Sequence, residues 1–485
     1  MNNTLTKKKK MGYAFGIFTE SLIYNMFYTY YLTFLNEIVG IQPKFSAIII
    51  FVSIAWDAIT DPMIGSYADR PGVDKRKLMK KSILPLALLF VVAWTSIGNE
   101  LFTAEIAKIL FYVVVTMALW VFYTVYTIPY YAVVAELTED YDERTQIRST
   151  ASLVNAGAIA LGNILPALVP TVMILGIKDN AYAVIAGIVS VIAIVAGFVC
   201  TKSLKGLYQP KTTLNSDSET FKGTLKAFGN IIKMKPALTF LVFVFFFLAG
   251  SSMIQSNLTY MVVDCIGMNY DEGIVVVILA LVGSMAVIVP VVEKVAEKTD
   301  RRTACISFFI VAIVGEVICK IIGLDATIGG FKIMLVVCPL LLGIGTGTFW
   351  TLFYSMGYDL VEIDEFKTGK RREAIITSLP QLVQKFGSAF GILMVGQLLS
   401  AYGYNKDLDV STSAETVVQL VTDPKILNGM ENISTIFPAI LFTISLVALV
   451  FYPITRKRVN ALMAQLKNKR EGKPYNTDGF EALLK

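Results

Sequence analysis

The chain has 485 residues, of which 55% are hydrophobic and 16% charged, with a formal net charge of +6 and a mean hydropathy of +0.62. A soluble domain carries roughly 25% charged residues, so this composition excludes a soluble globular protein and indicates a chain that crosses a membrane many times. The sequence contains no histidine, which excludes histidine metal sites, Ser-His-Asp triads and histidine proton relays.

A spanning helix needs about 20 apolar residues, and the sequence predicts twelve such segments. We expect them at residues 12–36, 44–68, 82–99, 105–135, 149–176, 180–200, 236–263, 272–292, 304–323, 331–361, 374–402 and 434–454. The first contains an acid and no small-residue cleavage site, so we expect it to stay as a span and not to be removed as a signal peptide. The longest basic loop separates six spans from six. The predicted domains are residues 1–200, a linker at 201–235, residues 236–454 and a tail at 455–485.

The basic residues predict the orientation of these spans. Of the 43 Lys and Arg residues, 35 lie in the terminal segments and in the loops on the same side as the termini, and seven lie in the opposite loops. Basic loops remain in the cytoplasm, so we expect a multi-pass protein of the cell membrane with both termini cytoplasmic.

A weak internal repeat supports the division into halves. The end of the fourth span reads TIPYYAVVAELTED, and the end of the tenth reads TLFYSMGYDLVEID, with two acids at the same spacing. Asp-Arg at 69–70, after the second span, has a counterpart at 300–301, after the eighth. Repeated halves are typical of secondary transporters that bind their solute between the halves near mid-membrane.

Charged residues inside the apolar spans are the candidate functional groups. Asp57 and Asp61 lie one helical turn apart on one helix face, at depths of roughly 18 Å and 12 Å from the cytoplasmic edge. Glu20 and Lys385 lie at comparable depths of roughly 12 Å and 16 Å. A buried ion pair is the structural alternative, but it uses one lysine and one acid and leaves two acids over. Charges in a bilayer are costly, so we interpret the four as one water-lined cavity.

The five cysteines are scattered singly, without metal-site spacing. We expect them to act as small buried apolar side chains. With no histidine and no nucleophile motif, we expect no enzyme activity and no cofactor.

Several motifs resemble one known family. Trp56-Asp57-Ala58-Ile59-Thr60-Asp61-Pro62 is similar to the second-helix motif of the glycoside–pentoside–hexuronide:cation symporters, the melibiose-permease family. Thr127-Ile128-Pro129-Tyr130, Glu365-Phe366-Lys367 and Lys385-Phe386-Gly387-Ser388-Ala389 agree in order. Gly65-x-x-x-Asp69-Arg70-x-Gly72 resembles the loop after the second helix of the major facilitator superfamily. The resemblance covers essentially the whole chain and implies twelve transmembrane helices in two six-helix pseudo-repeats.

The resemblance also implies a set of site residues. The cation ligands would be Asp57, Thr60, Asp61 and Thr124. The solute-binding residues would be Glu20, Ser21, Tyr28, Thr127, Tyr131, Trp350, Gln381 and Lys385, and the cytoplasmic gate would use Asp69, Arg70, Arg144 and Asp359. Two departures weaken a Na⁺ site: Thr60 replaces a common Asn, and Thr127 replaces a fourth-helix acid of the melibiose-type members.

The leading hypothesis is cation-coupled symport of a sugar or glycoside by alternating access. The coupling ion is H⁺ or Na⁺, with H⁺ favoured because Lys385 repels Na⁺ and one acid is missing. We expect Lys385 to pair with a second-helix carboxylate in the cation-free state. The alternatives are an uncoupled facilitator or antiporter and a transporter of a lipid-like or steroid-like solute. The expected partners are a small solute and the lipid bilayer, without nucleic acid, and the expected state is a monomer.

Overall fold

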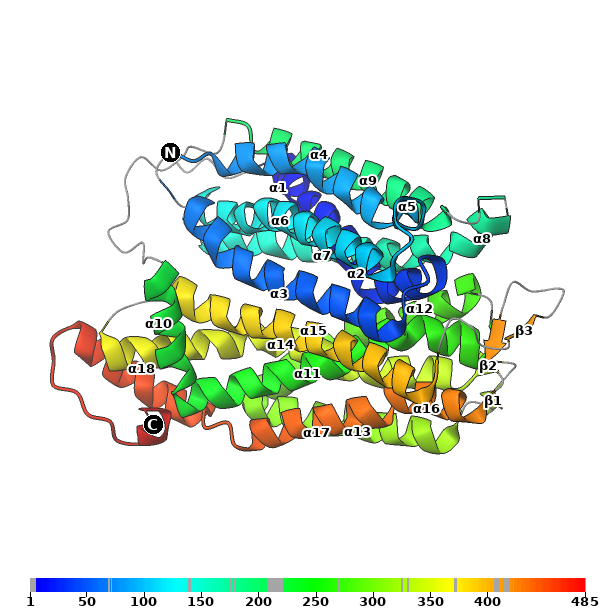
Figure 1. Ribbon diagram of the computed structural model, residues 1–485. Coiled ribbons are helices and arrows are strands. Elements are labelled where there is room, and N and C mark those ends of the chain that lie inside the picture. Colours follow the sequence, from blue (N-terminus) through cyan, green and yellow to red (C-terminus); the bar gives the residue numbers. More distant parts are fainter. Residues whose placement is uncertain are drawn as a thin grey trace. The chain divides into compact units, whose positions relative to one another are not determined.

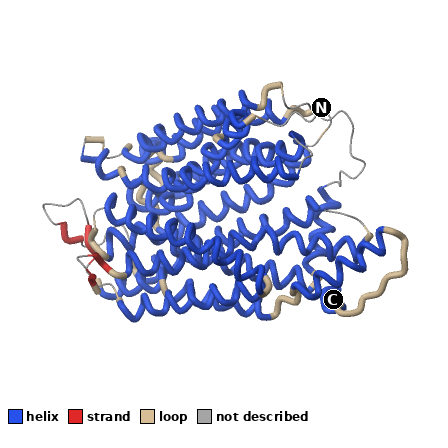
Figure 2. Tube along the Cα trace, turned by 180° about the vertical axis from the view of Figure 1, so that it is seen from behind, coloured by secondary structure: helices blue, strands red, loops and turns tan. Residues whose placement is uncertain are grey.

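The computed structural model describes residues 6–68, 70, 72–137, 141–174, 176–177, 180–206, 221–268, 270–323, 326–328, 331–369, 373–404, 410–412, 419–421 and 423–484. Helices make up nearly all of this trace (Figure 2). The apolar segments of the sequence form helices because a helix satisfies its own backbone hydrogen bonds where no water is present.

The elements before the linker are all helical (Figure 1). They are α1 (Lys7–Ala14), α2 (Gly16–Thr33), the π-helical turn η1 (Phe34–Ile38), α3 (Pro43–Ala68), α4 (Lys75–Ala93), α5 (Ile97–Leu101), α6 (Glu105–Leu137), α7 (Tyr141–Ala167), α8 (Val169–Ile174) and α9 (Ala181–Ser203). Asp74 caps the start of α4 by accepting a hydrogen bond from the backbone N–H of Lys77 at 3.0 Å.

The later elements repeat this helical pattern and add two short antiparallel hairpins. They are α10 (Phe221–Ile232), α11 (Lys235–Thr259), the π-helical turn η2 (Tyr260–Cys265), α12 (Tyr270–Lys298), α13 (Arg301–Ile322), β1 (Thr327–Ile328), β2 (Phe331–Lys332), α14 (Met334–Thr368), α15 (Glu373–Tyr402), β3 (Val410–Thr412), β4 (Gln419–Val421), α16 (Pro424–Ser434), α17 (Ile436–Val450), α18 (Arg456–Arg470) and α19 (Glu481–Leu484). Each strand of these hairpins has only two or three residues, and the hairpins lie in connections between helices. The protein is therefore an all-α membrane protein.

Each of the twelve predicted spans coincides with a helix or with consecutive helices. Within the described residues, ten helices are long and apolar enough to cross a membrane. The helices of the first and third predicted spans, α2 and α4, are not among these ten. Helix α2 carries Glu20 and four tyrosines, and the first two turns of α4 carry five Lys and Arg residues, which lowers their mean hydropathy.

The chain separates by its internal packing into two compact units. The first comprises residues 1–218, 255–275 and 392–426, and the second comprises residues 219–254, 276–391 and 427–485. In the first unit, α6 lies against α3 and α4, and α9 lies against α2 and α4 (Figure 1). Segment 255–275 joins this unit through hydrogen bonds from η1 and α2, including Asn36 to Tyr260 and Thr33 with Thr259. The boundary predicted at 201–235 stays a prediction.

The second unit has an aromatic core between α11, α13 and α14. The ring of Phe247 stacks on Phe309 at 4.7 Å and on Phe349 at 4.5 Å between centroids. Helix α15 approaches α11 so closely that a Cβ at Gly387 or Gly391 would collide with the α11 backbone. Small residues allow such close helix packing in membranes, which explains the glycine of the Lys385-Phe386-Gly387 motif.

A disulfide connects Cys319, in the last turn of α13, to Cys338, in the second turn of α14, with 6.1 Å between their Cα atoms. The prediction that the cysteines act only as buried apolar side chains is therefore wrong for this pair. Sequence spacing did not reveal the bond because the two helices are brought together by tertiary packing. Cys200 and Cys305 are free and buried, as predicted, and Cys265 is free and half-buried.

The tail folds onto the end of α14. Arg470 donates to both carboxylate oxygens of Glu365, at 2.7 and 2.6 Å, and these hydrogen bonds raise the pKa of the guanidinium above its usual value. The rings of Tyr475 and Phe480 contact Phe366 edge-on at 5.6 and 5.2 Å, and Phe480 is fully buried. The tail is polar in sequence, yet this part of it belongs to the packed structure.

Candidate functional site

Helices α3 and α6 bring two carboxylates to one hydroxyl. Thr124 Oγ1 lies 2.5 Å from Asp57 Oδ1 and 3.0 Å from Asp61 Oδ1. Thr124 is fully buried, Asp57 is 2% exposed and Asp61 is half-buried. The i, i+4 spacing on α3 places both acids on the face that packs against α6, as the sequence predicted.

The proton count of this cluster constrains what it can hold. A threonine hydroxyl has one proton and two lone pairs, so Thr124 can donate fully to only one of the two carboxylates. The second short contact is favourable when the other acid carries a proton, or when a cation lies close to both oxygens. Thr60 donates to the backbone oxygen of Asp57 at 3.0 Å and so offers only its lone pairs to a cation. These residues therefore fit a proton or a small hard cation.

A second cluster joins α2 to α6. Tyr131 donates from its Oη to Glu20 Oε2 at 2.6 Å, and Tyr123 donates to Glu20 Oε1 at 3.4 Å. Glu20 is half-buried and Tyr131 is 42% exposed, so the carboxylate and one phenol can be reached from outside the packed core. Tyr123 directly precedes Thr124, so the two acid clusters are neighbours along α6.

The other predicted solute-binding residues of the first unit are buried. Ser21 donates to Asn155 Oδ1 of α7, so its hydroxyl connects two helices. Tyr28 stacks on Tyr24 with 4.1 Å between centroids. Thr127 is 7% exposed and lies one turn beyond Tyr123 on α6.

Three predicted solute residues belong to the second unit. Trp350 packs edge-on against Phe349 and Phe353 at the margin of the aromatic core. Gln381 is exposed and Lys385 is half-buried, both on α15. Their assignment to the solute site, and the pairing of Lys385 with an acid of α3, stay predictions.

The predicted gate is described in part. Asp69 lies outside the described residues, and of Arg144 only the helical backbone in α7 is described. Arg70 lies over the ring of Tyr67 at 5.5 Å. Asp359 accepts two hydrogen bonds from Arg301 Nη1, both at 2.7 Å, so the acid of α14 is tied to the first residue of α13.

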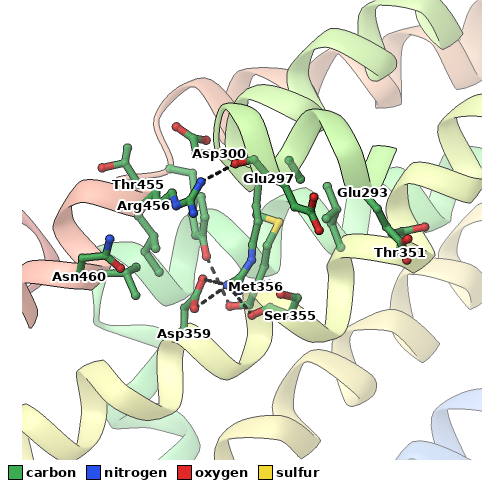
Figure 3. Close-up of a pocket in the computed structure, with 16 residues that line it drawn as sticks. Glu293, Glu297, Asp300, Thr351, Ser355, Met356, Asp359, Thr455, Arg456 and Asn460 are labelled. Atoms are coloured by element: carbon green, nitrogen blue, oxygen red, sulfur yellow. Dashed lines mark hydrogen bonds and ion pairs between the residues drawn. The ribbon is translucent and has the colours of Figure 1, made fainter. Parts of the chain in front are cut away.

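This ion pair lies beside a cavity of about 620 Å³ within the second unit (Figure 3). Glu293, Glu297 and Thr351 line it together with the paired residues, and Arg456 donates to the backbone oxygen of Glu297 across one side. Its walls are the end of α12, the start of α13, the later turns of α14 and the start of α18. The cavity therefore opens where the pair, the helix ends and the tail meet.

Comparison with known proteins identifies the family. The family described as MFS/sugar transport protein matches residues 12–456, which is nearly the whole chain. The chain belongs to this family. It is a transporter and not an enzyme, and the resemblance to the glycoside–pentoside–hexuronide:cation symporters is confirmed.

Relatives and solved structures agree with that assignment. The transporter is 24% identical to the uncharacterized symporter YnaJ of Bacillus subtilis, over 98% of this chain and 97% of that protein. It is also 24% identical to the isoprimeverose transporter of Lactiplantibacillus pentosus, over 96% of this chain and 92% of that one. A point mutant of the nucleoside transporter NupG superposes with a TM-score of 0.64 at 12% identity, over 92% of this chain and all of that one, which establishes the major facilitator fold.

Sequence reasoning missed two functional candidates in this transporter. Tyr123 shares a helix face with Thr127 and Tyr131 at spacings of four residues, a periodic signal that was available in the sequence. Arg301 stands in the repeated Asp-Arg pair, but its partner across α13 and α14 could only be found from the packing.

Proposed function

We propose that this transporter is a symporter in which a cation bound at Asp57, Asp61 and Thr124 drives the movement of a sugar or glycoside. The observation that supports it is the single hydroxyl of Thr124 lying within hydrogen-bond distance of two carboxylates. A proton or a cation bound at this cluster would lie beside both carboxylates and offset the repulsion between them. The relatives named as symporters are consistent with this coupling.

The solute site that we propose is the cluster around Glu20. A carboxylate and phenol oxygens are acceptors and donors suited to sugar hydroxyls, and aromatic faces such as Tyr28 suit the apolar face of a sugar ring. The relative named as an isoprimeverose transporter makes a glycoside the first solute to test. Ser21, Thr127 and Tyr131 complete the proposed set in the first unit.

Coupling follows from the position of both clusters on α6. A cation at Thr124 fixes the helix that also carries Tyr123 and Tyr131, so cation and solute favour the same arrangement of α2, α3 and α6. Two ligands that favour the same state raise each other's affinity. In alternating access this coupling makes the loaded transporter the species that changes between inward-facing and outward-facing states. Asp69, Arg70, Arg144 and Asp359 are proposed to act at the cytoplasmic gate.

We propose that both termini face the cytoplasm of the cell. The basic loops support this orientation, and the disulfide gives an independent argument. Cys319 lies at the end of α13 that is opposite to Arg301 and Arg302. Disulfides persist on the oxidising side of a membrane, so the end of α13 that carries Cys319 would face outward.

The test uses proteoliposomes and labelled isoprimeverose, with glycosides and amphiphiles as competitors. We expect uptake to follow a pH gradient in Na⁺-free buffer and to collapse with a protonophore. Asp57→Asn and Asp61→Asn should lose gradient-driven accumulation but keep solute exchange. Asp74→Asn is the matched control, because asparagine still caps α4.

Each alternative has its own outcome in this experiment. A saturable requirement for Na⁺ replaces H⁺ by Na⁺ as the coupling ion. Uptake that ignores every gradient and stops at equal inside and outside concentrations, alike in the wild type and both mutants, would mean an uncoupled facilitator. Competition by amphiphiles but not by glycosides would indicate a lipid-like solute.

A further inference from the structure

Helix α13 contains a buried acid that the proposed transport site does not use. Glu316 is 1% exposed, and among the described residues neither of its carboxylate oxygens has a hydrogen-bond partner. An ionised carboxylate without a partner in such surroundings is very unfavourable, and the group instead becomes neutral by binding a proton.

The lysine that could neutralise Glu316 is bound to another acid. Lys320 lies four residues later on the same helix, a spacing that suits a Glu–Lys pair. Its Nζ nevertheless contacts Glu431 Oε2 at 2.5 Å and Asn428 Oδ1 at 2.8 Å, both on α16. The side chains of Lys320 and Glu431 are 25% and 10% exposed, so this pair lies closer to water than Glu316 does.

The helices packed against α13 carry their other charges away from the turn that holds Glu316. Helices α14 and α17 pack against α13. Helix α17 contains no Asp, Glu, Lys or Arg, and α14 contains none of these before Asp359. The arginines of α13 stand at its first two positions, about four turns from Glu316. Apart from Lys320 and Glu431, the ionisable groups on these elements are Lys425 of α16, the arginines and Cys305 of α13, Tyr354 and Tyr358 of α14, and the charged residues in the last turns of α14, which are Asp359, Glu362, Asp364, Glu365 and Lys367.

We propose that Glu316 is a proton-binding site in the second unit. Glu316, Lys320 and Glu431 form a trio of ionisable groups. The trio is neutral when Lys320 is an ammonium, one carboxyl group is ionised and the other carries a proton. In this structure the proton is on Glu316 and Lys320 pairs with Glu431. If Lys320 turns to Glu316, the proton leaves Glu316 and Glu431 takes one up, so the trio stays neutral. The site is separate from the acids of α3 and does not depend on the proposed symport.

Infrared difference spectroscopy of the purified full-length protein tests the site. At neutral pH the wild type should show a protonated-carboxyl C=O band that Glu316→Gln removes. Glu431→Gln removes the acid that holds Lys320, so Lys320 can pair with Glu316 and the band should weaken in this variant too. Asp74→Asn, at the start of α4, is the control and should keep the band. Glu316→Asp should move the band without removing it. A carboxyl C=O band of undiminished intensity in Glu316→Gln, or no band in the wild type, overturns the proposal.

Thermal unfolding gives a second readout. Unfolded Glu316 loses its proton above about pH 4.3, whereas the folded protein retains it. Ionisation of the unfolded state therefore lowers the stability of the wild type progressively as the pH rises from 5 to 8. Glutamine cannot ionise, so the unfolding midpoint of Glu316→Gln should exceed that of the wild type by a gap that widens with pH. A constant gap, a gap of opposite sign, or a Glu316→Gln protein that does not fold argues that the native acid is ionised. These measurements use no ion gradient and no solute, so this proposal and the symport proposal can fail separately.

Discussion

Replacing Thr124 by valine tests the α3–α6 cluster directly. The change keeps the shape of the side chain and removes the hydroxyl that lies 2.5 Å from Asp57 and 3.0 Å from Asp61. A hydrogen bond to a charged group contributes about 1.5–3 kcal/mol, and the hydroxyl has one proton, so one such bond is lost in full. The lost bond stabilises the ionised carboxylate, so at 1.4 kcal/mol per factor of ten the apparent H⁺ affinity should rise roughly 10- to 100-fold. A Na⁺ ion would instead lose a ligand oxygen and bind more weakly.

The assay measures solute uptake as a function of external pH and, separately, of Na⁺ concentration. Thr116→Val is the matched control, because Thr116 is also fully buried on α6 and also contacts α3, but through Ser53 Oγ at 2.5 Å and not through an acid. We expect both variants to lose some stability and only Thr124→Val to change its cation affinity. Equal cation dependence in the two variants would refute the assignment of Thr124 as a ligand.

Three further changes probe other parts of the structure. Tyr131→Phe removes the phenol proton that Glu20 accepts at 2.6 Å, so the KM for the solute should rise several-fold while the cation dependence stays the same; an unchanged KM would place the solute elsewhere. Arg301→Ala and Asp359→Asn, measured alone and combined, should give a coupling energy of about 1 kcal/mol in unfolding measurements. The value is small because Arg301 is 44% exposed and solvent screens the pair. Strictly additive losses of stability would argue against an interaction between the two residues. Phe480→Ala removes a fully buried ring and costs at most about 3–5 kcal/mol of local packing. Trypsin should therefore cleave the tail faster. An unaltered cleavage rate would show that the folding of the tail does not depend on this ring.

The sequence predicted those features of the fold that depend on local patterns. Apolar length and basic loops predicted the helices, and the i, i+4 spacing of Asp57 and Asp61 predicted that both acids face one neighbour. The Asp-Arg repeat at 300–301 marked the region where Arg301 binds Asp359. Each of these signals lies within a few residues of the chain.

Features that depend on packing between distant segments were not predictable in the same way. Nothing near Cys319 indicates that Cys338, across a helix–helix connection, will reach it. Glu20 was identified by its charge, but its phenol partners come from α6, more than 100 residues later. The burial of Phe480 was hidden because a polar tail gives no periodic signal until α14 provides the surface on which it folds.

The two attachments of α14 restrict how this helix can move. Near one end the Cys319–Cys338 bond fixes it to α13, and near the other end the folded tail surrounds Phe366. Phe366 lies 28 positions after Cys338, about 42 Å along the helix, so the two attachments lie close to opposite ends of α14. Movement of α14 by one helical turn, about 5.4 Å, along α13 would break the Cys319–Cys338 disulfide. At the end that carries this bond, α13 and α14 can therefore change their position by tilting together but not by sliding a full turn past each other.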